Sequence, residues 1–509
     1  MIIAYDLGTG GLKASIHNEE GLILESAFEP YKTYFKDMIY QEQMPDDWWN
    51  AVVLTTRQLV MKSGVEVSDI TCLAISGHSL GTVPVDKDGN LLQDKTPIWS
   101  DMRAKKQARA FFGCYDFKKW YMTTGNGFPR DLYTVFKIKW LEENEPELFK
   151  KTYKFLGTKD YLNLKLTGQM LTDHSYASGS GVYNLRANAY DDEIILAVGL
   201  NRDVLPEIVS SAQVIGTLTK EAASALGLSV STKVVSGGVD NSCMALGAGC
   251  FDEGSVYLSF GTSAWIALSS DEPVLDADKY PFVFAHCVPG QYTSAVSSFT
   301  AAGALNWAKE RICADLSEQA EKRGKEIFEL IEEHAANSPA GANKLIFNPN
   351  LLGGSAFEES PFIRGGFAGL VMSHTRDDML RSVMEGVAMN LAVVFELLQS
   401  LTDVSDELLL VGGGSKSPLW RQIITDVFNT RTKKTTVDQN AASLGAASLA
   451  LVGTGVWKDY SKIKELHSVT EFREPTPENV QKYEKIMPIF KEVSSFYARI
   501  GEQLESIEL

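Results

Sequence analysis

The feature that most constrains the fold of this 509-residue chain is a pattern that occurs twice. Near the N-terminus, "MIIAYDLGTGGLKASIHN" (1–18) reads as a strand, a turn of small residues and a second strand. "GSVYLSFGTSAWIALSS" (254–270) has the same order, and "DELLLVGGGSKSPL" (406–419) similarly repeats "SDITCLAISGHSL" (68–80). Chance similarity of short glycine-rich stretches can explain one such pair. Two pairs in the same order favour a duplicated domain whose two turns face one shared site.

Strands and helices alternate around these patterns. "LKASIHN" (12–18) and "LILESAFE" (22–29) read as strands joined by the turn "EEG", and "DWWNAVVLTTRQLVMKSG" (47–64) has the apolar spacing of a helix. A longer helical pattern over 375–401 begins at Thr375, a residue type that suits a helix N-terminus. The alternation predicts an α/β protein with a largely buried central sheet.

The length of the chain predicts two domains, because a single hydrophobic core stops growing at about 250–300 residues. The sequence contains no low-complexity linker, so we expect a compact hinge, which we place near 245–253. The predicted domains are therefore 1–245 and 246–509.

The charge of the chain bears on its partners. It carries 48 basic and 65 acidic residues, a net charge of −17 that repels nucleic acid and anionic membranes and favours an enzyme acting on small molecules. The N-terminal strand lacks the basic and apolar segments of a signal peptide, and no uncharged apolar run is long enough to span a membrane. Six scattered cysteines form no C-x-x-C pair, which favours a reducing compartment. We expect a cytoplasmic protein with neither nucleic-acid nor membrane partners.

The first small-residue turn, "DLGTGGLK" (6–13), has the chemistry of a phosphate site. Its glycines let the backbone approach a ligand closely, and the N–H groups of such a turn can cradle phosphate oxygens. Thr9 adds a hydroxyl group and Lys13 a cation. Asp6 would repel phosphate unless a cation stood between them, and Mg²⁺ has that role in nucleotide sites. The turn lacks the P-loop pattern, and a purely structural hairpin is the alternative interpretation.

Two later segments suit the rest of a nucleotide. "FGTSAW" (260–265) offers a second turn without the acid, and "LLLVGGGSKSPLW" (408–420) ends a buried strand with three glycines. A strand that runs into glycines and then a helix leaves room for a flat ring and a ribose. The dinucleotide pattern G-x-G-x-x-G lacks its third glycine here, which disfavours a hydride-transfer enzyme.

Asp240 is the remaining carboxylate of interest. In "VVSGGVDNSCMALGAG" (234–249) it follows a strand and two glycines and precedes a helical stretch of small residues. A carboxylate at such a strand end suits a general base that accepts a hydroxyl proton during phosphoryl transfer. A helix-capping aspartate is the alternative.

These segments occur in an order that resembles the FGGY carbohydrate kinases, and most closely their xylulokinase-like branch, over essentially the whole chain. In the family's first signature, Lys137 and Trp140 occupy the expected places. The segments that carry the resemblance are "DLGTGGLK" (6–13), "YQEQMPDDWW" (40–49), "TPIWSDMRA" (96–104), "YTVFKIKWLEENEPE" (133–147), "AAGALNW" (301–307) and "GGFAGLVMSHTRDDMLRSVMEG" (365–386).

The resemblance implies two ribonuclease H-like domains of the actin-like ATPase superfold, with an active-site cleft between them and with ATP and Mg²⁺ as cofactors. It implies that the first domain binds the sugar and supplies Asp240 as the catalytic base and Asp6 as the metal-associated carboxylate, while the second domain binds adenosine. The implied ATP-binding residues are Thr9, Gly10, Lys13, Gly261, Thr262, Ser263, Gly303, Asn306, Gly413, Gly414, Ser415 and Pro418. The implied substrate-binding residues are His78, Ser79, Leu80, Trp99, Asp101, Asp240 and Asn241.

One departure from the family concerns the substrate. Xylulokinases carry Gln-Met-His-Gly where this chain has "HSLG" (78–81), so His78 either contacts the sugar from a shifted position or is a packing residue. We predict an ATP-dependent kinase for a small sugar, first of all a pentulose such as xylulose. Another ketose, a polyol (glycerol or erythritol) or a sugar acid (gluconate) is the alternative acceptor, and an actin-like or Hsp70-like nucleotide switch is the alternative class. Members of the family often form homodimers, and these residues leave the oligomeric state open.

Overall fold

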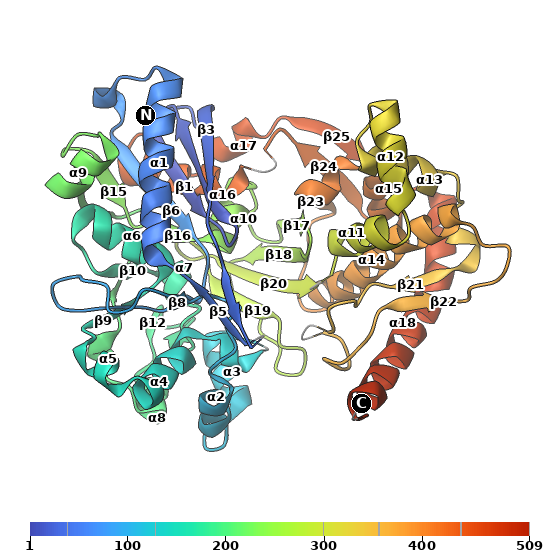
Figure 1. Ribbon diagram of the computed structural model, residues 1–509, viewed down its shortest axis with the longest axis horizontal. Helices are drawn as coiled ribbons and strands as arrows, with labels where there is room; N and C mark the ends of the chain where they lie inside the picture. The colour runs from blue at the N-terminus through green and yellow to red at the C-terminus, as the bar shows by residue number, and fades with distance from the viewer. Residues whose placement is uncertain (38, 128, 299, 355–356, 438–439, 508–509) are drawn as a thin grey trace. The chain divides into compact units, whose positions relative to one another are not determined.

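The computed structural model describes residues 1–37, 39–127, 129–298, 300–354, 357–437 and 440–507, and the chain forms two compact units (Figure 1). Unit 1 contains Met1–Glu253, Ser269–Ser294 and Asn440–His467. Unit 2 contains Gly254–Leu268, Ala295–Gln439 and Ser468–Leu509. The division into 1–245 and 246–509 rests on the sequence alone and stays a prediction.

Unit 1 is built on a seven-stranded sheet. Its strands are, in order, β14 (Val214–Thr217), β15 (Lys233–Val235), β6 (Cys72–Gly77), β1 (Ile2–Leu7), β2 (Gly11–His17) and β3 (Ile23–Pro30), with β16 (Gly238–Val239) paired to β6 beside this path. β1, β15 and β16 run parallel to β6, while β1–β2 and β2–β3 are antiparallel hairpins. The hairpin expected over 12–29 is thereby confirmed.

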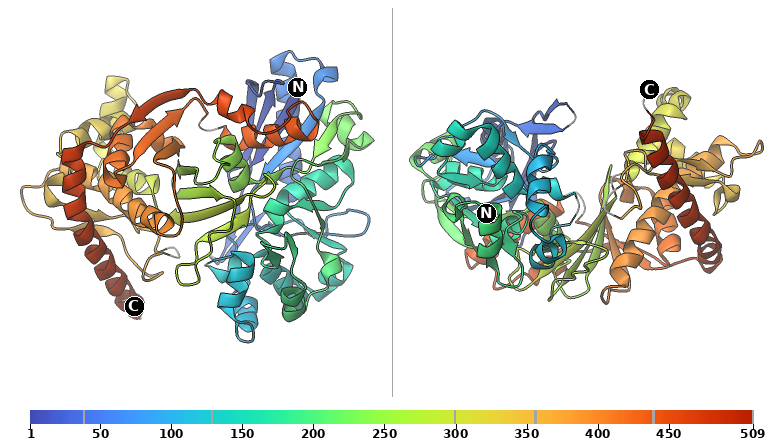
Figure 2. Two further views of the ribbon diagram at one scale, coloured as in Figure 1. Left: turned by 180° about the vertical axis from the view of Figure 1, so that it is seen from behind. Right: turned by 90° about the horizontal axis from the view of Figure 1, so that it is seen from below.

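Helices cover both faces of this sheet. α1 (Pro45–Ser63) and α6 (Thr158–Thr167) pack on one face, and α10 (Asp240–Gly247) and α16 (Ala441–Gly453) pack on the other. α1 confirms the helix expected over 47–64: it has a proline in its first turn and ends at Gly64 in the left-handed conformation. α16 lies beside the N-terminal strands although it is distant from them in sequence (Figure 2, left).

Alternation along β1 decides which face each side chain occupies. Ile3, Tyr5 and Leu7 belong to the core beneath α1 and α6, whereas Ile2 and Ala4 belong to the core beneath α10 and α16. The same period places the side chain of the next even-numbered residue, Asp6, on the face covered by α10 and α16.

α10 and α16 cross at very short distance because glycines lie at the crossing. A Cβ atom on Gly247 would lie 1.8 Å from the carbonyl oxygen of Ala441, and one on Gly445 would lie 2.0 Å from that of Cys243. No side chain fits at either position without moving a helix backbone. The crossing therefore positions α10, and with it Asp240, against the sheet.

Other elements of unit 1 surround the sheet. Its further helices are α2 (Lys105–Phe112), α3 (Phe117–Thr124), α4 (Thr134–Asn144), α5 (Pro146–Lys151), α7 (His174–Ala177), α8 (Asp192–Val198), α9 (Lys220–Leu226) and α17 (Lys462–Leu466). Its short strands include β4 (Tyr34–Lys36), β5 (Tyr40–Gln43), β7 (Val83–Val85), β8 (Thr96–Pro97), β9 (Lys154–Leu156), β10 (Leu171–Asp173), β12 (Ala189–Tyr190) and β13 (Glu207–Val209).

A second seven-stranded sheet repeats the pairing of the first. Its order is β19 (Phe282–Ala285), β20 (Tyr292–Ser298), β18 (Ala264–Ser270), β17 (Val256–Phe260), β23 (Glu407–Val411), β24 (Arg431–Thr435) and β25 (Val469–Arg473). β17 forms an antiparallel hairpin with β18 and runs parallel to β23, as β1 does with β2 and β6. This confirms the repeat expected from the two sequence patterns.

Unit 2 is organised around a long buried helix. α14 (Arg376–Gln399) directly follows Thr375, as the sequence predicts, and the Thr375 hydroxyl accepts a hydrogen bond from the amide of Asp378 in a reciprocal capping box. By length and composition α14 could cross a membrane, but 78% of its most apolar window is buried inside the protein, which marks it as a core helix. The other helices described in unit 2 are α11 (Ala302–Arg311), α12 (Ala314–Arg323), α13 (Ile327–Ala336), α15 (Pro418–Phe428) and α18 (Pro477–Glu505).

Candidate active site

Asp6 and Asp240 lie on the two sides of β6. Asp6, near the end of β1, is in register with Ser76, whose hydroxyl donates a hydrogen bond to its carboxylate at 3.2 Å. On the other side of β6, Val239 of β16 is in register with Gly77, and Asp240 follows as the first residue of α10. The topology thus brings together two carboxylates that are far apart in sequence.

Burial acts on the charge of both carboxylates, and Asp240 also experiences the charge of Asp6. Burial, together with the negative charge of Asp6, raises the pKa of Asp240 to about 7. Burial also raises the pKa of Asp6, although Lys13 and the Ser76 hydroxyl act in the opposite direction. Within the described residues, no group of three His, Cys, Asp or Glu side chains could hold a metal ion. A cation at this pair would therefore take its other ligands from phosphate or water.

Asp240 is not a helix cap. The residue at the cap position of α10 is Val239, and the Asp240 carboxylate accepts a hydrogen bond from the neighbouring amide of Asn241 at 2.7 Å. An aspartate that caps a helix accepts an amide two or three residues further on. The geometry therefore favours a chemical role for Asp240 over a capping role.

The first small-residue turn joins β1 to β2, and a side chain from another segment donates a hydrogen bond to it. The Gly8 amide donates to the carbonyl oxygen of Gly11 at 3.1 Å, and the Thr9 carbonyl accepts a hydrogen bond from Gln43 Nε2 at 2.7 Å. In the part of the chain that the structure describes, the amides of Thr9 and Gly10 donate to no backbone carbonyl. These amides suit the expected phosphate cradle. Lys13 is directly opposite Asp6 in the hairpin register.

Trp99 links this turn to the segments predicted to bind the acceptor. Its indole N–H donates to the Thr9 hydroxyl at 3.0 Å, and its side chain is 40% exposed. Trp99 and Asp101 lie in a loop that follows the two-residue strand β8. Trp99 therefore presents an open aromatic surface beside the first turn.

The Asp101 carboxylate forms hydrogen bonds within the protein. Its side chain is fully buried, and its carboxylate accepts hydrogen bonds from the Arg103 guanidinium at 2.7 and 2.8 Å and from the amide of Gln41 at 2.7 Å. Arg103 also contacts Glu42 at 2.6 Å. The role of Asp101 in substrate binding stays a prediction, and its contacts suit a residue that shapes the loop.

The "HSLG" turn follows β6 and contains residues of different character. His78 is 1% exposed, its ring packs edge-on against Trp48 at a centroid distance of 5.5 Å, and burial lowers its pKa to about 3. Trp48 belongs to α1, on the sheet face opposite α10, which favours a packing role for His78. Ser79 is half-buried, and Leu80 has a positive φ of 59°. Ser79 is thus the member of the turn best placed to meet an acceptor.

The second turn and the start of α11 form one local structure in unit 2. The Gly303 amide donates to the carbonyl oxygen of Thr262 at 2.9 Å, and the Ala302 amide donates to that of Gly261 at 3.0 Å. A Cβ atom on Gly303 would lie 3.0 Å from the Thr262 carbonyl oxygen, so this close approach favours glycine. Thr262 and Ser263 are exposed, and Asn306 follows Gly303 by one helical turn on α11.

The glycines after β23 lie against the end of β17, the strand that leads into the second turn. A Cβ atom on Gly414 would lie 2.6 Å from the ring of Phe260, the last residue of β17. Gly413 is exposed, as is Pro418 in the first turn of α15. Ser415 is fully buried, and its hydroxyl donates to the carbonyl oxygen of Gly412 at 2.7 Å. Ser415 therefore shapes this turn, and its role in ATP binding stays a prediction.

Sequence reasoning did not predict the placement of one buried residue, Lys137. It was notable only as part of a motif, but its amino group lies among backbone carbonyls of both predicted acceptor segments. Burial lowers its pKa to about 7. No local pattern signals this placement, because the carbonyls belong to residues 38 to 57 positions away in the sequence.

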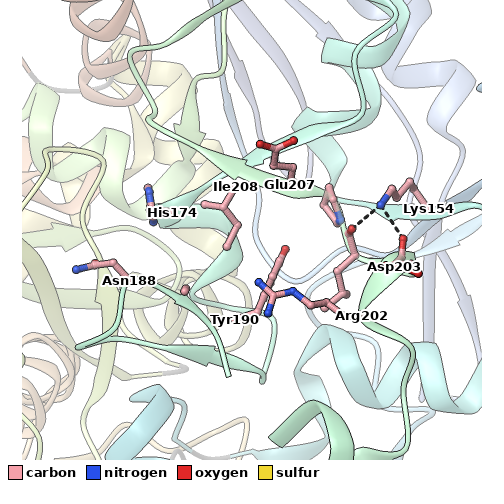
Figure 3. A pocket seen from close by; sticks show the side chains of 11 residues that line it. Lys154, His174, Asn188, Tyr190, Arg202, Asp203, Glu207 and Ile208 are labelled. Atoms are coloured by element: carbon pink, nitrogen blue, oxygen red, sulfur yellow. Dashed lines mark hydrogen bonds between the residues drawn. The ribbon is translucent and has the colours of Figure 1, made fainter. Parts of the chain in front are cut away.

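A separate cavity of about 380 Å³ lies elsewhere in unit 1 (Figure 3). The Lys154 amino group at its edge donates to the carbonyl oxygens of Asp203 at 2.6 Å and Leu205 at 2.9 Å. Arg202 pairs with Asp192. None of the predicted site residues lines this cavity, so it belongs to no part of the candidate site.

The comparisons with known proteins cover both units. The model of the FGGY family of carbohydrate kinases matches with its N-terminal domain at residues 1–247 and with its C-terminal domain at residues 256–454. The xylulose kinase of Bacillus subtilis is 30% identical over 512 residues, 99% of each chain.

Two solved structures match the fold of this chain over almost its whole length. The ligand-bound xylulose kinase from Lactobacillus acidophilus has a TM-score of 0.91 and 25% identity, and covers 99% of both chains. The gluconate kinase from the same organism has a TM-score of 0.90 and 25% identity, again with 99% of both chains covered. They confirm the predicted two-domain, actin-like ATPase fold. The chain belongs to the FGGY family of carbohydrate kinases, and it is a phosphotransferase whose acceptor is an alcohol group of a small sugar.

Proposed function

We propose that this protein transfers the γ-phosphate of ATP to a hydroxyl group of a pentulose, first of all xylulose. The observation that carries the proposal is the Asp6–Asp240 pair at the ends of neighbouring strands, with the pKa of Asp240 raised to about 7. A carboxylate with a pKa close to the working pH can accept a proton and still be ionised in a large fraction of molecules.

In this mechanism Asp240 accepts the proton of the acceptor hydroxyl as its oxygen attacks the γ-phosphorus in line and the bond to the β–γ bridging oxygen breaks. Positioning and charge neutralisation supply most of the acceleration, because the transition state of phosphoryl transfer needs little assistance from a strong base. Asp240 therefore acts mainly by orienting the hydroxyl and receiving its proton.

The first turn binds the phosphates. The amides of Thr9 and Gly10 and the cation of Lys13 supply donors and positive charge for the phosphate oxygens. Asp6 fits a role as the carboxylate that faces Mg²⁺, because a buried carboxylate beside another is stabilised by a cation. When bound, Mg²⁺ neutralises phosphate charge.

We assign the adenosine and the remaining phosphate contacts to unit 2. The exposed Thr262 and Ser263 offer hydroxyl groups at a second turn, and the glycines at 413 and 414 leave an open backbone after β23. Gly303, Asn306 and Pro418 border these turns within the same unit. The assignment also includes Ser415, whose hydroxyl shapes the turn that carries these glycines.

The residues assigned to the acceptor favour a neutral polyhydroxy compound over a sugar acid. Ser79 and Trp99 offer a hydroxyl group and an aromatic surface. Two cations that contact these segments already have partners within the protein. Arg103 pairs with Asp101 and Glu42, and Lys137 donates to backbone carbonyls. A gluconate carboxylate would find no available cation among these side chains, whereas a ketose needs only hydrogen bonds.

ADP release from ATP and Mg²⁺ over an acceptor panel tests this function. The panel contains D- and L-xylulose, D- and L-ribulose, hexuloses, erythritol, glycerol and gluconate. We expect one ketopentose to be preferred. Preference for gluconate or a polyol would contradict the proposed acceptor, and ATP binding without turnover on any acceptor would contradict the proposed reaction on these substrates.

The pH dependence of the wild-type enzyme and of Asp6→Asn tests the acidic pair. Because Asp240 must be ionised to accept a proton, kcat/KM for the acceptor should fall as the pH drops through about 7, the pKa of Asp240. Burial is the larger cause of this raised pKa and the charge of Asp6 adds to it, so Asp6→Asn should move the acid limb to lower pH while the maximal rate falls. Initial rates between about pH 5 and 8.5 measure both effects.

Asp86→Asn is the control, because Asp86 is a surface carboxylate that makes its contacts within its own turn. Its acid limb should coincide with that of the wild type. An unchanged midpoint in Asp6→Asn would show that Asp6 does not influence the titrating group.

A further inference from the structure

The amino group of Lys137 is buried among carbonyl oxygens. Lys137 lies on α4 and is 0% exposed. Its Nζ donates to the carbonyl oxygens of Ile98 at 2.7 Å, Leu80 at 3.0 Å and Trp99 at 3.5 Å. Among the described residues, no carboxylate forms an ion pair with it. Burial of a cation without a carboxylate partner is costly, so the carbonyl oxygens around Nζ are the groups that stabilise its charge.

These carbonyls come from both segments assigned to the acceptor. Leu80 belongs to the turn 78–81, and Trp99 belongs to the loop 98–101. The direct backbone link between these parts of the chain is long, with the Thr82 amide 3.3 Å from the carbonyl oxygen of Pro97. Lys137 joins the two segments through a single atom. Through Trp99, which donates to Thr9, the same arrangement reaches the phosphate turn.

The turn at 78–81 needs such support because its backbone is strained. Leu80 has a φ of 59°, a left-handed conformation that is unfavourable for a residue other than glycine. The carbonyl of Leu80 is bonded to Lys137, and the carbonyl of His78 accepts hydrogen bonds from the hydroxyls of Thr158 at 2.7 Å and Tyr176 at 3.1 Å. The turn is therefore fastened on both sides of Ser79.

The same helix also secures the second segment. Trp140 follows Lys137 by one turn of α4, and the Arg103 guanidinium lies 4.9 Å from the centre of its ring. Arg103 in turn holds the Asp101 carboxylate at 2.7 Å. Both contacts of α4 thus act on the loop that carries Trp99.

We propose that Lys137 is a positioning residue that holds the segments 78–81 and 98–101 in the one arrangement that binds the acceptor. This inference rests on the proposed function, which assigns acceptor binding to these segments. Protonated Lys137 has three N–H donors, and three carbonyls already receive them, so none is left for a substrate. It therefore acts through the shape of the site and not by contact with the acceptor.

Lys137→Met tests the proposal, since methionine is similar in length but donates no hydrogen bond. The matched control is Lys154→Met, because Lys154 in the same unit also donates to two backbone carbonyls but lies at the separate cavity (Figure 3). Lys137→Gln, which keeps two N–H donors, should restore part of the function and serves if the methionine variant does not fold.

The first measurement is amide hydrogen exchange of the full chain without any ligand. In the wild type, the amides of Gly81, Ile98 and Asp101 donate to Tyr176, Gln41 and Ile98, respectively, at 3.0–3.3 Å. In Lys137→Met these amides should exchange at least about tenfold faster. Local opening of the two segments then costs less free energy, because there are no bonds to Nζ to break. In Lys154→Met their exchange should match the wild type. Unchanged exchange in Lys137→Met would overturn the proposal.

The second measurement is steady-state kinetics with the acceptor that the panel selects. Lys137→Met should raise the KM of the acceptor about tenfold or more while the KM of ATP stays within about twofold. Equal losses for both substrates, or faster exchange with both KM values unchanged, would overturn the proposal. A wild-type enzyme that phosphorylates no member of the panel would instead refute the proposed function, and the exchange experiment would still decide whether Lys137 holds the two segments.

Discussion

Asp240→Asn is expected to lower kcat by about 10²–10⁴-fold, while the KM of ATP stays within about twofold of the wild-type value. Asparagine has the shape of aspartate and its side-chain oxygen can still accept the Asn241 amide, so the start of α10 is preserved. What the substitution removes is the ability to accept the acceptor proton. Initial rates at saturating acceptor and ATP, with nucleotide binding measured separately by calorimetry, give both quantities.

The matched control for this experiment is Asp191→Asn. Asp191 caps α8 in the same unit, where its carboxylate accepts the Ile194 amide at 3.0 Å. Because asparagine is also a good capping residue, this variant should keep its kcat and lose only a little stability. If Asp240→Asn behaved like Asp191→Asn, with near-normal turnover, Asp240 would have a structural role and the assignment of the base would be wrong.

Gly247→Ala is expected to cause the largest loss of stability, with the free energy of unfolding reduced by about 1–3 kcal/mol or more. The new Cβ atom would lie 1.8 Å from the carbonyl oxygen of Ala441, and this backbone atom cannot rotate away. Relief requires α10 to move relative to α16. Since α10 begins with Asp240, the turnover of the folded fraction should also fall.

Urea denaturation of Gly247→Ala, followed by circular dichroism, measures the loss. Gly10→Ala is the control for stability alone, because no atom lies within 4 Å of a Cβ atom at that position. It should change the free energy of unfolding by less than about 0.5 kcal/mol. Equal stability of the two variants would mean that the α10–α16 crossing can adjust, and the rigid placement of Asp240 would then lose its support.

Elements that depend on neighbouring residues could be predicted well. The hairpin over 12–29, the helix over 47–64 and the start of α14 at Thr375 all follow from local hydrogen bonds, turn residues and the period of apolar side chains. The internal repeat also followed from the sequence, because both hairpins need small residues in their turns.

Contacts between distant residues could not be predicted in the same way. The bond from Ser76 to Asp6 joins residues 70 positions apart, and the bond from Lys137 to Leu80 joins residues 57 positions apart. Alternation along β6 also could not place His78, because the chain turns after Gly77 and packs its ring on Trp48. Such contacts depend on the path of the whole chain.

By itself, the sequence determined the α/β class, the duplicated hairpins, the family, and the residue types available for phosphate transfer, since these follow from local patterns. Only the tertiary structure decided the electrostatic state of those residues. Asp240 acquires a raised pKa because folding removes water from it and places a second carboxylate near it. Lys137 becomes a link between two loops because folding surrounds it with their carbonyls. Desolvation and long-range packing exist only in the folded chain, which is why no short segment could reveal them.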